Sequence, residues 1–152
     1  MISIKSDYEI SLMRIAGNIV YQTHQYLKPF IKPGITTKEL DKLAHDFIIS
    51  KDAYPSCLGY EGYPASICIS VNEEVVHGIP SKRKLRNGDI VKLDICACYK
   101  GYHGDSAWSY AVGDISDEKK YLLKHTEDSL YEGLKQVREG ARIGDISNAV
   151  EN

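Results

Sequence analysis

The chain has 152 residues, of which 43% are hydrophobic, and a formal net charge of −2. This length supports one globular domain with a buried core, and the slightly negative charge argues against a strongly basic nucleic-acid surface. No run approaches the roughly 18 apolar residues of a membrane span, and the first residues lack a basic segment followed by an apolar one. We therefore expect a cytoplasmic protein that binds neither DNA nor membrane.

Two amphipathic helices are predicted within the first fifty residues. Ser6 and Glu9 have the spacing of a capping box, and apolar residues then recur at helical intervals for about twenty residues. Thr36 and Glu39 repeat this pattern ahead of a second helix that ends near Ser50. Two histidines fall within these helices, where packing or a surface position is the favoured interpretation: His24 and His45.

Residues 89–112 read DIVKLDICACYKGYHGDSAWSYAV and predict an antiparallel hairpin. Two stretches rich in β-formers flank Lys100 and Gly101, which suit a two-residue turn. That turn sets a register in which Asp94 and Asp105 are diagonal neighbours on one face, about 7–8 Å apart at Cα. Two carboxylates this close repel each other unless a positive charge lies between them, so a pair of divalent cations is the first candidate. The predicted strands are 90–99 and 102–112.

The residues alone leave three interpretations of this hairpin face open. The first is a metal site that uses the hard oxygen ligands of the two aspartates. The second is a structural zinc site, which a Cys-x-Cys pair within a regular strand disfavours. The third is that both aspartates simply face water. The zinc site would use Cys96, Cys98 and His103. All four cysteines are expected to be reduced thiols.

The segment between the second helix and the hairpin is rich in Pro, Gly, Tyr and Cys. Within it, residues 66–71 read SICISV and predict a strand. The basic run at residues 82–86 follows a turn and is expected to be a solvated loop.

The end of the chain repeats features of its beginning. Residues 34–40 read GITTKEL and residues 140–146 read GARIGDI, and each follows an amphipathic helix. The later helix has Ser116 as its predicted N-cap and runs to about Arg138. An internal duplication explains this similarity. We therefore expect residues 1–152 to form a single but incomplete catalytic-type domain, with 1–112 as the first repeat and 113–152 as the start of a truncated second repeat.

Two motifs together resemble one known family. YPSCLGYEGYPASICISVNEEVVHGIP followed by NGDIVKLDICACYKGYHGDSAWSYAVG is similar to the type I methionine aminopeptidases of metallopeptidase family M24. The resemblance spans the whole chain but only about the N-terminal three fifths of a family member. It implies an α+β pita-bread (creatinase/aminopeptidase-like) fold, with an antiparallel sheet covered by helices. The implied activity is metal-dependent hydrolysis that removes the initiator Met when the second residue is small.

The resemblance also implies roles for single residues. Asp94 and Asp105 match ligands of two divalent metal ions, whose identity among Co, Mn, Fe, Zn and Ni stays open. His77 matches the catalytic histidine that contacts the substrate and stabilises the scissile carbonyl. Asn72 matches a residue near a monovalent-cation site built from backbone carbonyls. The matched positions that line the pocket for the Met side chain are Cys57, Tyr60, Tyr63 and Cys68.

In that family the remaining ligands, one His and two Glu, come from the second repeat, and a Glu from there acts as general base. The chain is therefore expected to ligate its metals incompletely and to be inactive alone. The implied partners are a peptide or nascent-chain N-terminus, the ribosome, and either the missing repeat or a second copy of the chain. The alternative function is a non-catalytic half-fold that binds peptide N-termini or a partner protein.

Overall fold

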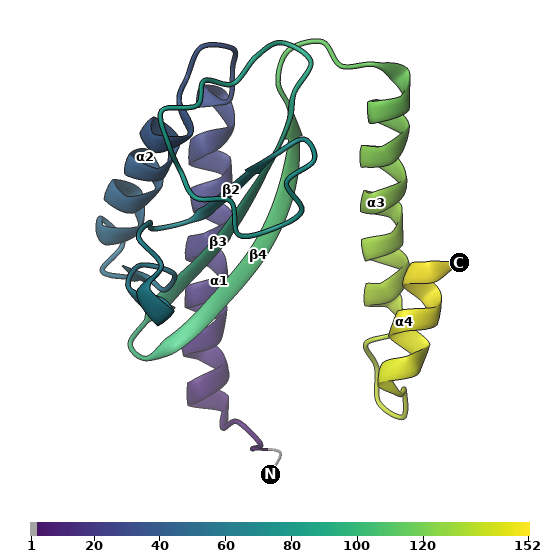
Figure 1. Ribbon diagram of the computed structural model, residues 1–152. Coiled ribbons are helices and arrows are strands. Elements are labelled where there is room, and N and C mark those ends of the chain that lie inside the picture. Colours follow the sequence, from purple (N-terminus) through teal and green to yellow (C-terminus); the bar gives the residue numbers. More distant parts are fainter. Residues whose placement is uncertain (1–2) are drawn as a thin grey trace. The chain divides into compact units, whose positions relative to one another are not determined.

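The computed structural model describes residues 3–152 and divides the chain into two compact units (Figure 1). The first unit ends at Asp114 and the second is Ile115–Asn152. The expected repeat boundary, between residues 112 and 113, lies close to this division. The duplication itself stays a prediction.

Helices α1 (Asp7–Leu27) and α2 (Thr37–Ile49) begin at the two predicted capping boxes. Ser6 N donates to the Glu9 carboxylate at 2.7 Å, and Thr36 N donates to the Glu39 carboxylate at 2.8 Å. The hydrogen bonds from Ser6 lower the pKa of Glu9 to about 2. Both predicted helix starts are confirmed, because a capping box is formed by residues only three positions apart.

The first unit contains a four-stranded antiparallel sheet built around β3; its strands are β1 (Tyr54–Pro55), β2 (Cys68–Val71), β3 (Ile90–Tyr99) and β4 (Tyr102–Ala111). Strand β4 pairs along one edge of β3, while β2 and the short β1 pair with successive parts of its other edge. The structure confirms the predicted register, with Asp94 opposite Ala107 and Asp105 opposite Cys96. The turn residues between β3 and β4 both have positive φ, 50° and 85°, as a tight hairpin turn requires.

Burial alternates along β3 and distinguishes two faces of the sheet. Helices α1 and α2 pack on one face, which forms the hydrophobic core (Figure 1). From Val91 to Cys98, the β3 side chains on this covered face are fully buried, and those on the opposite, open face are only half-buried. The predicted helix-covered sheet is thereby confirmed. The buried β3 residues are Val91, Leu93, Ile95 and Ala97.

Helix α1 approaches β4 so closely at one point that only glycine fits. A Cβ atom on Gly104 would lie 2.4 Å from Gly17 N and 2.6 Å from Ala16 O. Nearby, His24 is buried, with Nδ1 3.0 Å from the Tyr110 hydroxyl and Nε2 3.2 Å from the Ser106 carbonyl. Of the two interpretations left open for His24, packing or a surface position, the structure shows packing.

The second unit consists of α3 (Asp117–Lys135) and α4 (Ile143–Glu151). The predicted N-cap is confirmed, since Ser116 Oγ accepts a hydrogen bond from Lys119 N at 3.3 Å. The prediction that this helix continues to Arg138 is wrong. Gln136 N and Val137 N bond to the carbonyls three residues earlier, a tightening typical of a helix end.

Within residues 3–152, no helix has the length and apolar character that a membrane crossing needs.

Candidate metal and substrate site

The two predicted metal ligands lie on the open face of the hairpin. Asp94 is half-buried on β3, and Asp105 is exposed on β4. Burial raises the pKa of the Asp94 carboxyl, and the negative charge of Asp105 raises it further. The charge of His77 opposes this rise. The two aspartates therefore lie close enough to interact, as the register predicted.

The donor set of this pair suits a divalent cation. Two carboxylates that repel each other gain from a shared positive ion, and oxygen donors are the ligands that hard divalent ions prefer. In the described part of the chain, no three His, Cys, Asp or Glu side chains form a group that could hold a metal ion. Asp94 and Asp105 would thus supply only part of a metal's ligand shell.

The alternative zinc site on the same face is not formed. Within residues 3–152, no group of three potential metal ligands includes Cys96, Cys98 or His103. His103 Nδ1 instead lies 2.9 Å from Ser56 Oγ. Alternate residues of a strand share a face, but a regular strand does not bend their side chains around one ion.

All five predicted substrate-contacting residues line one pocket of about 430 Å³. They come from three chain segments: the turn region after β1, strand β2, and the loop after β2. Cys68 on β2 is the cross-strand partner of Asp94 on β3, so this pocket adjoins the aspartate pair. The predicted residues are Cys57, Tyr60, Tyr63, Cys68 and His77, and the motifs did not single out the lining residues Glu61, Pro64 and Ile79.

The loop after β2, residues 72–79, is called here the His77 loop. It is held against β2 because Ile69 N donates to Gly78 O at 2.9 Å and Gly78 N donates to Ser70 Oγ at 3.1 Å. Tyr63 also donates its hydroxyl to Gly78 O at 2.9 Å. A Cβ atom on Gly78 would lie 2.2 Å from Ile69 O, so only glycine allows this approach.

His77 itself has a left-handed backbone, with φ of 58°. A non-glycine residue in this region is strained, and such strain is concentrated at functional sites. The strain is held by the hydrogen bonds on the next residue, Gly78. This conformation places His77 in the pocket lining, within electrostatic reach of Asp94 and Cys68.

Two thiols in the pocket, those of Cys57 and Cys68, share a hydrogen bond that shifts the pKa of each. The hydrogen bond between Cys57 and Cys68, together with burial, raises the pKa of Cys57. Donation from Cys57 and from the Tyr63 hydroxyl lowers the pKa of Cys68, against the effect of burial. All four cysteines are free, as predicted. The pocket wall therefore combines soft sulfur atoms with aromatic rings.

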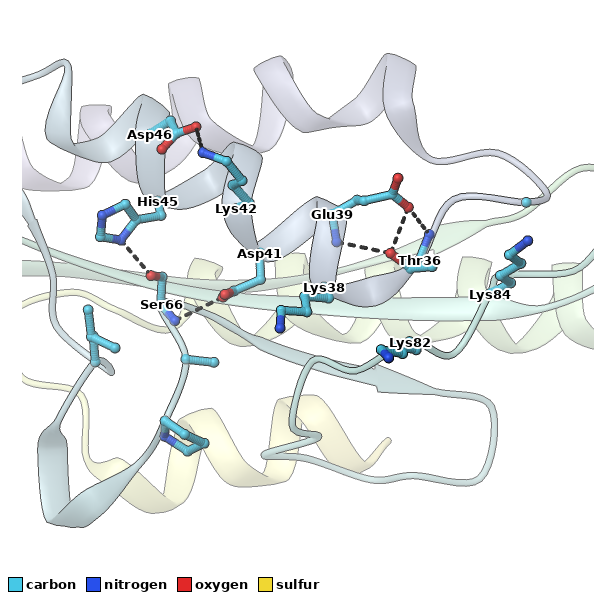
Figure 2. A pocket seen from close by; sticks show the side chains of 14 residues that line it. Thr36, Lys38, Glu39, Asp41, Lys42, His45, Asp46, Ser66, Lys82 and Lys84 are labelled. Atoms are coloured by element: carbon cyan, nitrogen blue, oxygen red, sulfur yellow. Dashed lines mark hydrogen bonds and ion pairs between the residues drawn. The ribbon is translucent and has the colours of Figure 1, made fainter.

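A larger pocket, of about 780 Å³, lies beside the start of α2 (Figure 2). Its carboxylates already have partners. Asp41 accepts hydrogen bonds from Ser66 N at 2.8 Å and Ile67 N at 3.0 Å, and Lys42 pairs with Asp46 at 2.6 Å (Figure 2). None of the predicted site residues lines it. We assign this pocket a structural role, in which α2 anchors the segment that leads into β2.

Asn72 lies at the start of the His77 loop and does not line the substrate pocket. Its backbone carbonyl, the predicted kind of ligand for a monovalent cation, accepts a hydrogen bond from Lys92 Nζ at 2.7 Å. The sequence motifs gave no signal for Lys92, because a lysine in a strand is ordinarily a solvated side chain.

The comparisons with known proteins all point the same way. A model described as metallopeptidase family M24 matches residues 11–152. The chain is 55% identical over 151 residues to methionine aminopeptidase 1 of Bacillus subtilis (strain 168), covering 99% of this chain and 61% of that relative. It is therefore shorter than two thirds of the length of this relative.

Solved structures agree with this. The crystal structure of methionine aminopeptidase from Rickettsia prowazekii matches with a TM-score of 0.96 and 41% identity, over 99% of this chain and 60% of that one. That of Thermotoga maritima methionine aminopeptidase matches with a TM-score of 0.95 and 38% identity, over 98% of this chain and 60% of that one.

Proposed function

Because the chain belongs to metallopeptidase family M24, we propose that it is the N-terminal part of a methionine aminopeptidase. Such an enzyme removes the initiator Met from proteins whose second residue is small. The observation that carries this proposal is that all five residues expected to contact the substrate line one pocket beside Asp94. The proposed place of action is the cytoplasm, on nascent-chain N-termini. Ribosome association and self-association stay predictions.

Divalent metal ions are the cofactors of a metallopeptidase, and Asp94 and Asp105 would hold them in part. A bound divalent ion polarises a carbonyl as a Lewis acid and generates a nucleophile from water. Further ligands would have to come from outside residues 3–152, since that part of the chain offers no larger donor group. Which of Co, Mn, Fe, Zn or Ni serves in the cell stays open in this proposal.

The pocket residues have two proposed tasks. The thiols and tyrosines bind the thioether of Met, because sulfur contacts aromatic ring edges and other soft atoms favourably. His77 lies in the pocket lining within electrostatic reach of Asp94, where an imidazole N–H can donate to the scissile carbonyl oxygen. The strained backbone of His77 is consistent with this role, because proteins tolerate such strain where it places a functional side chain.

Peptide binding without hydrolysis is the second candidate, and one observation favours it. The His77 loop exposes three apolar side chains, with Val75 at 84%, Val76 at 55% and Ile79 at 60% exposure. Ile79 also lines the substrate pocket. Exposed apolar residues in a loop that lines a pocket are typical of a binding surface. This surface could hold a peptide N-terminus even where the metal ligands are too few for hydrolysis.

The first experiment tests the metal site. Mn²⁺ is added to the purified chain, and bound Mn²⁺ is followed by electron paramagnetic resonance. We expect binding to the unmodified chain and its loss in Asp105→Asn. Asp114→Asn is the matched control, because Asp114 is an exposed aspartate outside the site. Equal binding by Asp105→Asn and the unmodified chain would overturn the metal assignment, whereas no binding by either would show that two carboxylates hold the ion too weakly without the further ligands.

The second experiment tests the reaction. Met release from a Met-Ala-Ser peptide is measured with the chain alone and with a polypeptide that supplies the part of the B. subtilis relative that this chain does not cover. We expect the mixture to release Met from Met-Ala-Ser but no amino acid from Leu-Ala-Ser. A mixture that contains the Asp105→Asn variant in place of the unmodified chain should release no Met. Peptide binding without release in either sample would favour the binding function. Neither binding nor release would overturn both candidates.

A further inference from the structure

Lys92 holds a positive charge against a backbone carbonyl of the His77 loop. It lies on the open face of β3, two residues before Asp94, and is half-buried. Its Nζ donates to Asn72 O at 2.7 Å. Among the ion pairs of residues 3–152, none involves Lys92. The Asn72 carbonyl is thus the fixed partner of this ammonium group.

Asn72 itself is held by hydrogen bonds at its backbone and at its side chain. Asn72 has a left-handed backbone, with φ of 55°, which Asn tolerates better than most residues. Its N–H donates to Ile90 O at 2.9 Å, and its side-chain oxygen accepts from Ile90 N at 3.0 Å. Its side-chain amide donates to Asp89 Oδ1 at 2.9 Å. These bonds hold the N–H and the side chain of Asn72, and Glu74 N donates to Val71 O at 3.3 Å, so the peptide that carries the Asn72 carbonyl lies inside a hydrogen-bonded turn.

This arrangement does not fit the monovalent cation that was expected at Asn72. A carbonyl dipole attracts any positive charge, and the ammonium already lies at the distance of a charge-assisted hydrogen bond. A K⁺ or Na⁺ ion on the same oxygen would stand beside a like charge, which is unfavourable. The residues present therefore favour Lys92 over a free ion.

We propose that Lys92 is a tethered cation that replaces a monovalent metal ion at the Asn72 carbonyl. Because it is covalently attached, its charge is present whatever the ionic composition of the medium. It fastens the first residue of the His77 loop to β3, the strand that carries Asp94. Lys92 is thus a positioning residue for this loop, and the role is independent of the aminopeptidase reaction.

The experiment measures thermal unfolding of the chain in KCl, NaCl and tetramethylammonium chloride at equal ionic strength. The unmodified chain is expected to have the same midpoint in all three salts. Lys92→Met keeps a long apolar stem and removes the charge. We expect it to lower the midpoint by about 2–4 °C in tetramethylammonium chloride, and K⁺ or Na⁺ to recover part of that loss.

Two further variants distinguish loss of the contact between Lys92 and Asn72 from the general effect of removing a lysine. Lys28→Met removes an exposed lysine of the same unit and should respond equally to all three salts. Lys92→Arg keeps a positive donor and should stay independent of the cation, which leaves a test even where Lys92→Met does not fold. A midpoint of the unmodified chain that rises selectively in KCl or NaCl would overturn the proposal. So would a folded Lys92→Met that is insensitive to the choice of cation. Neither measurement needs substrate, so failure here is distinct from failure of the proposed activity.

Discussion

Adjacent residues of β3 serve opposite faces of one sheet, and the contrast between Leu93 and Asp94 is the plainest case. Leu93 is fully buried in the core beneath the helices, whereas Asp94 is half-buried on the open face beside Asp105. A register shift of one residue would exchange the two faces. The hairpin register therefore decides at once what stabilises the first unit and where its candidate chemistry lies.

The largest expected effect is on the covered face. Leu93→Ala should lower the free energy of unfolding by about 2–5 kcal/mol, because it removes buried methyl groups and leaves a cavity. Urea unfolding followed by tryptophan fluorescence measures this directly, since the single Trp of the chain, Trp108, is the cross-strand partner of Leu93. A loss below about 1 kcal/mol would contradict the assignment of Leu93 to the core.

The next effect tests the contact between α1 and β4. Gly104→Ala should destabilise the unit by about 1–3 kcal/mol, because its Cβ would meet the backbone of α1 at Gly17. Gly17→Ala is the matched control from the other side of the same contact. A Cβ there meets nothing within 4 Å, so helix propensity should raise stability by about 0.5–1 kcal/mol. Equal destabilisation by both changes would contradict this one-sided contact.

A buried histidine of the covered face should make stability depend on pH. Burial lowers the pKa of His24, so below its ordinary value near 6.5 the unfolded chain binds a proton that the folded chain does not. The stability from neutral His24 is complete above that value and is lost as pH falls toward the lowered pKa. His24→Gln should cost about 1–2 kcal/mol at about pH 8, through its hydrogen bonds to Tyr110 and Ser106.

Urea unfolding of the unmodified chain and of His24→Gln, each at about pH 8 and about pH 5.5, measures this linkage. The variant should lose less stability on acidification than the unmodified chain. The same loss in both proteins would show that other groups carry the pH dependence.

The smallest effect on stability is expected on the open face. Asp94→Asn should change the free energy of unfolding by no more than about 0.5 kcal/mol without metal, because it removes a charge that Asp105 repels. The same variant should lose Mn²⁺ binding. Urea unfolding and paramagnetic resonance on one preparation test both statements. A large destabilisation would mean that Asp94 is structural, and the contrast with Leu93 would then fail.

Much of the fold and of the candidate site could be predicted from residues that lie close together in the sequence. The capping boxes at Ser6 and Thr36 fixed the helix starts, and the turn at Lys100 and Gly101 fixed the register that brings Asp94 near Asp105. These features depend on residues a few positions apart, or on a period of two along a strand, so a single sequence reveals them. Family motifs then nominated the five pocket residues, which the structure brings together.

Tertiary structure alone decided the remaining features, because they join residues far apart in sequence whose approach depends on packing. Examples are the burial of His24 against β4, the contact of Gly104 with α1, and the bond between Lys92 and Asn72. No periodicity marks these residues, since a spacing rule cannot say which atoms from distant parts of the chain come into contact. The hairpin's placement of carboxylates was thus available from the sequence. The hydrogen bond from Lys92 to the first residue of the His77 loop could be identified only in the folded chain.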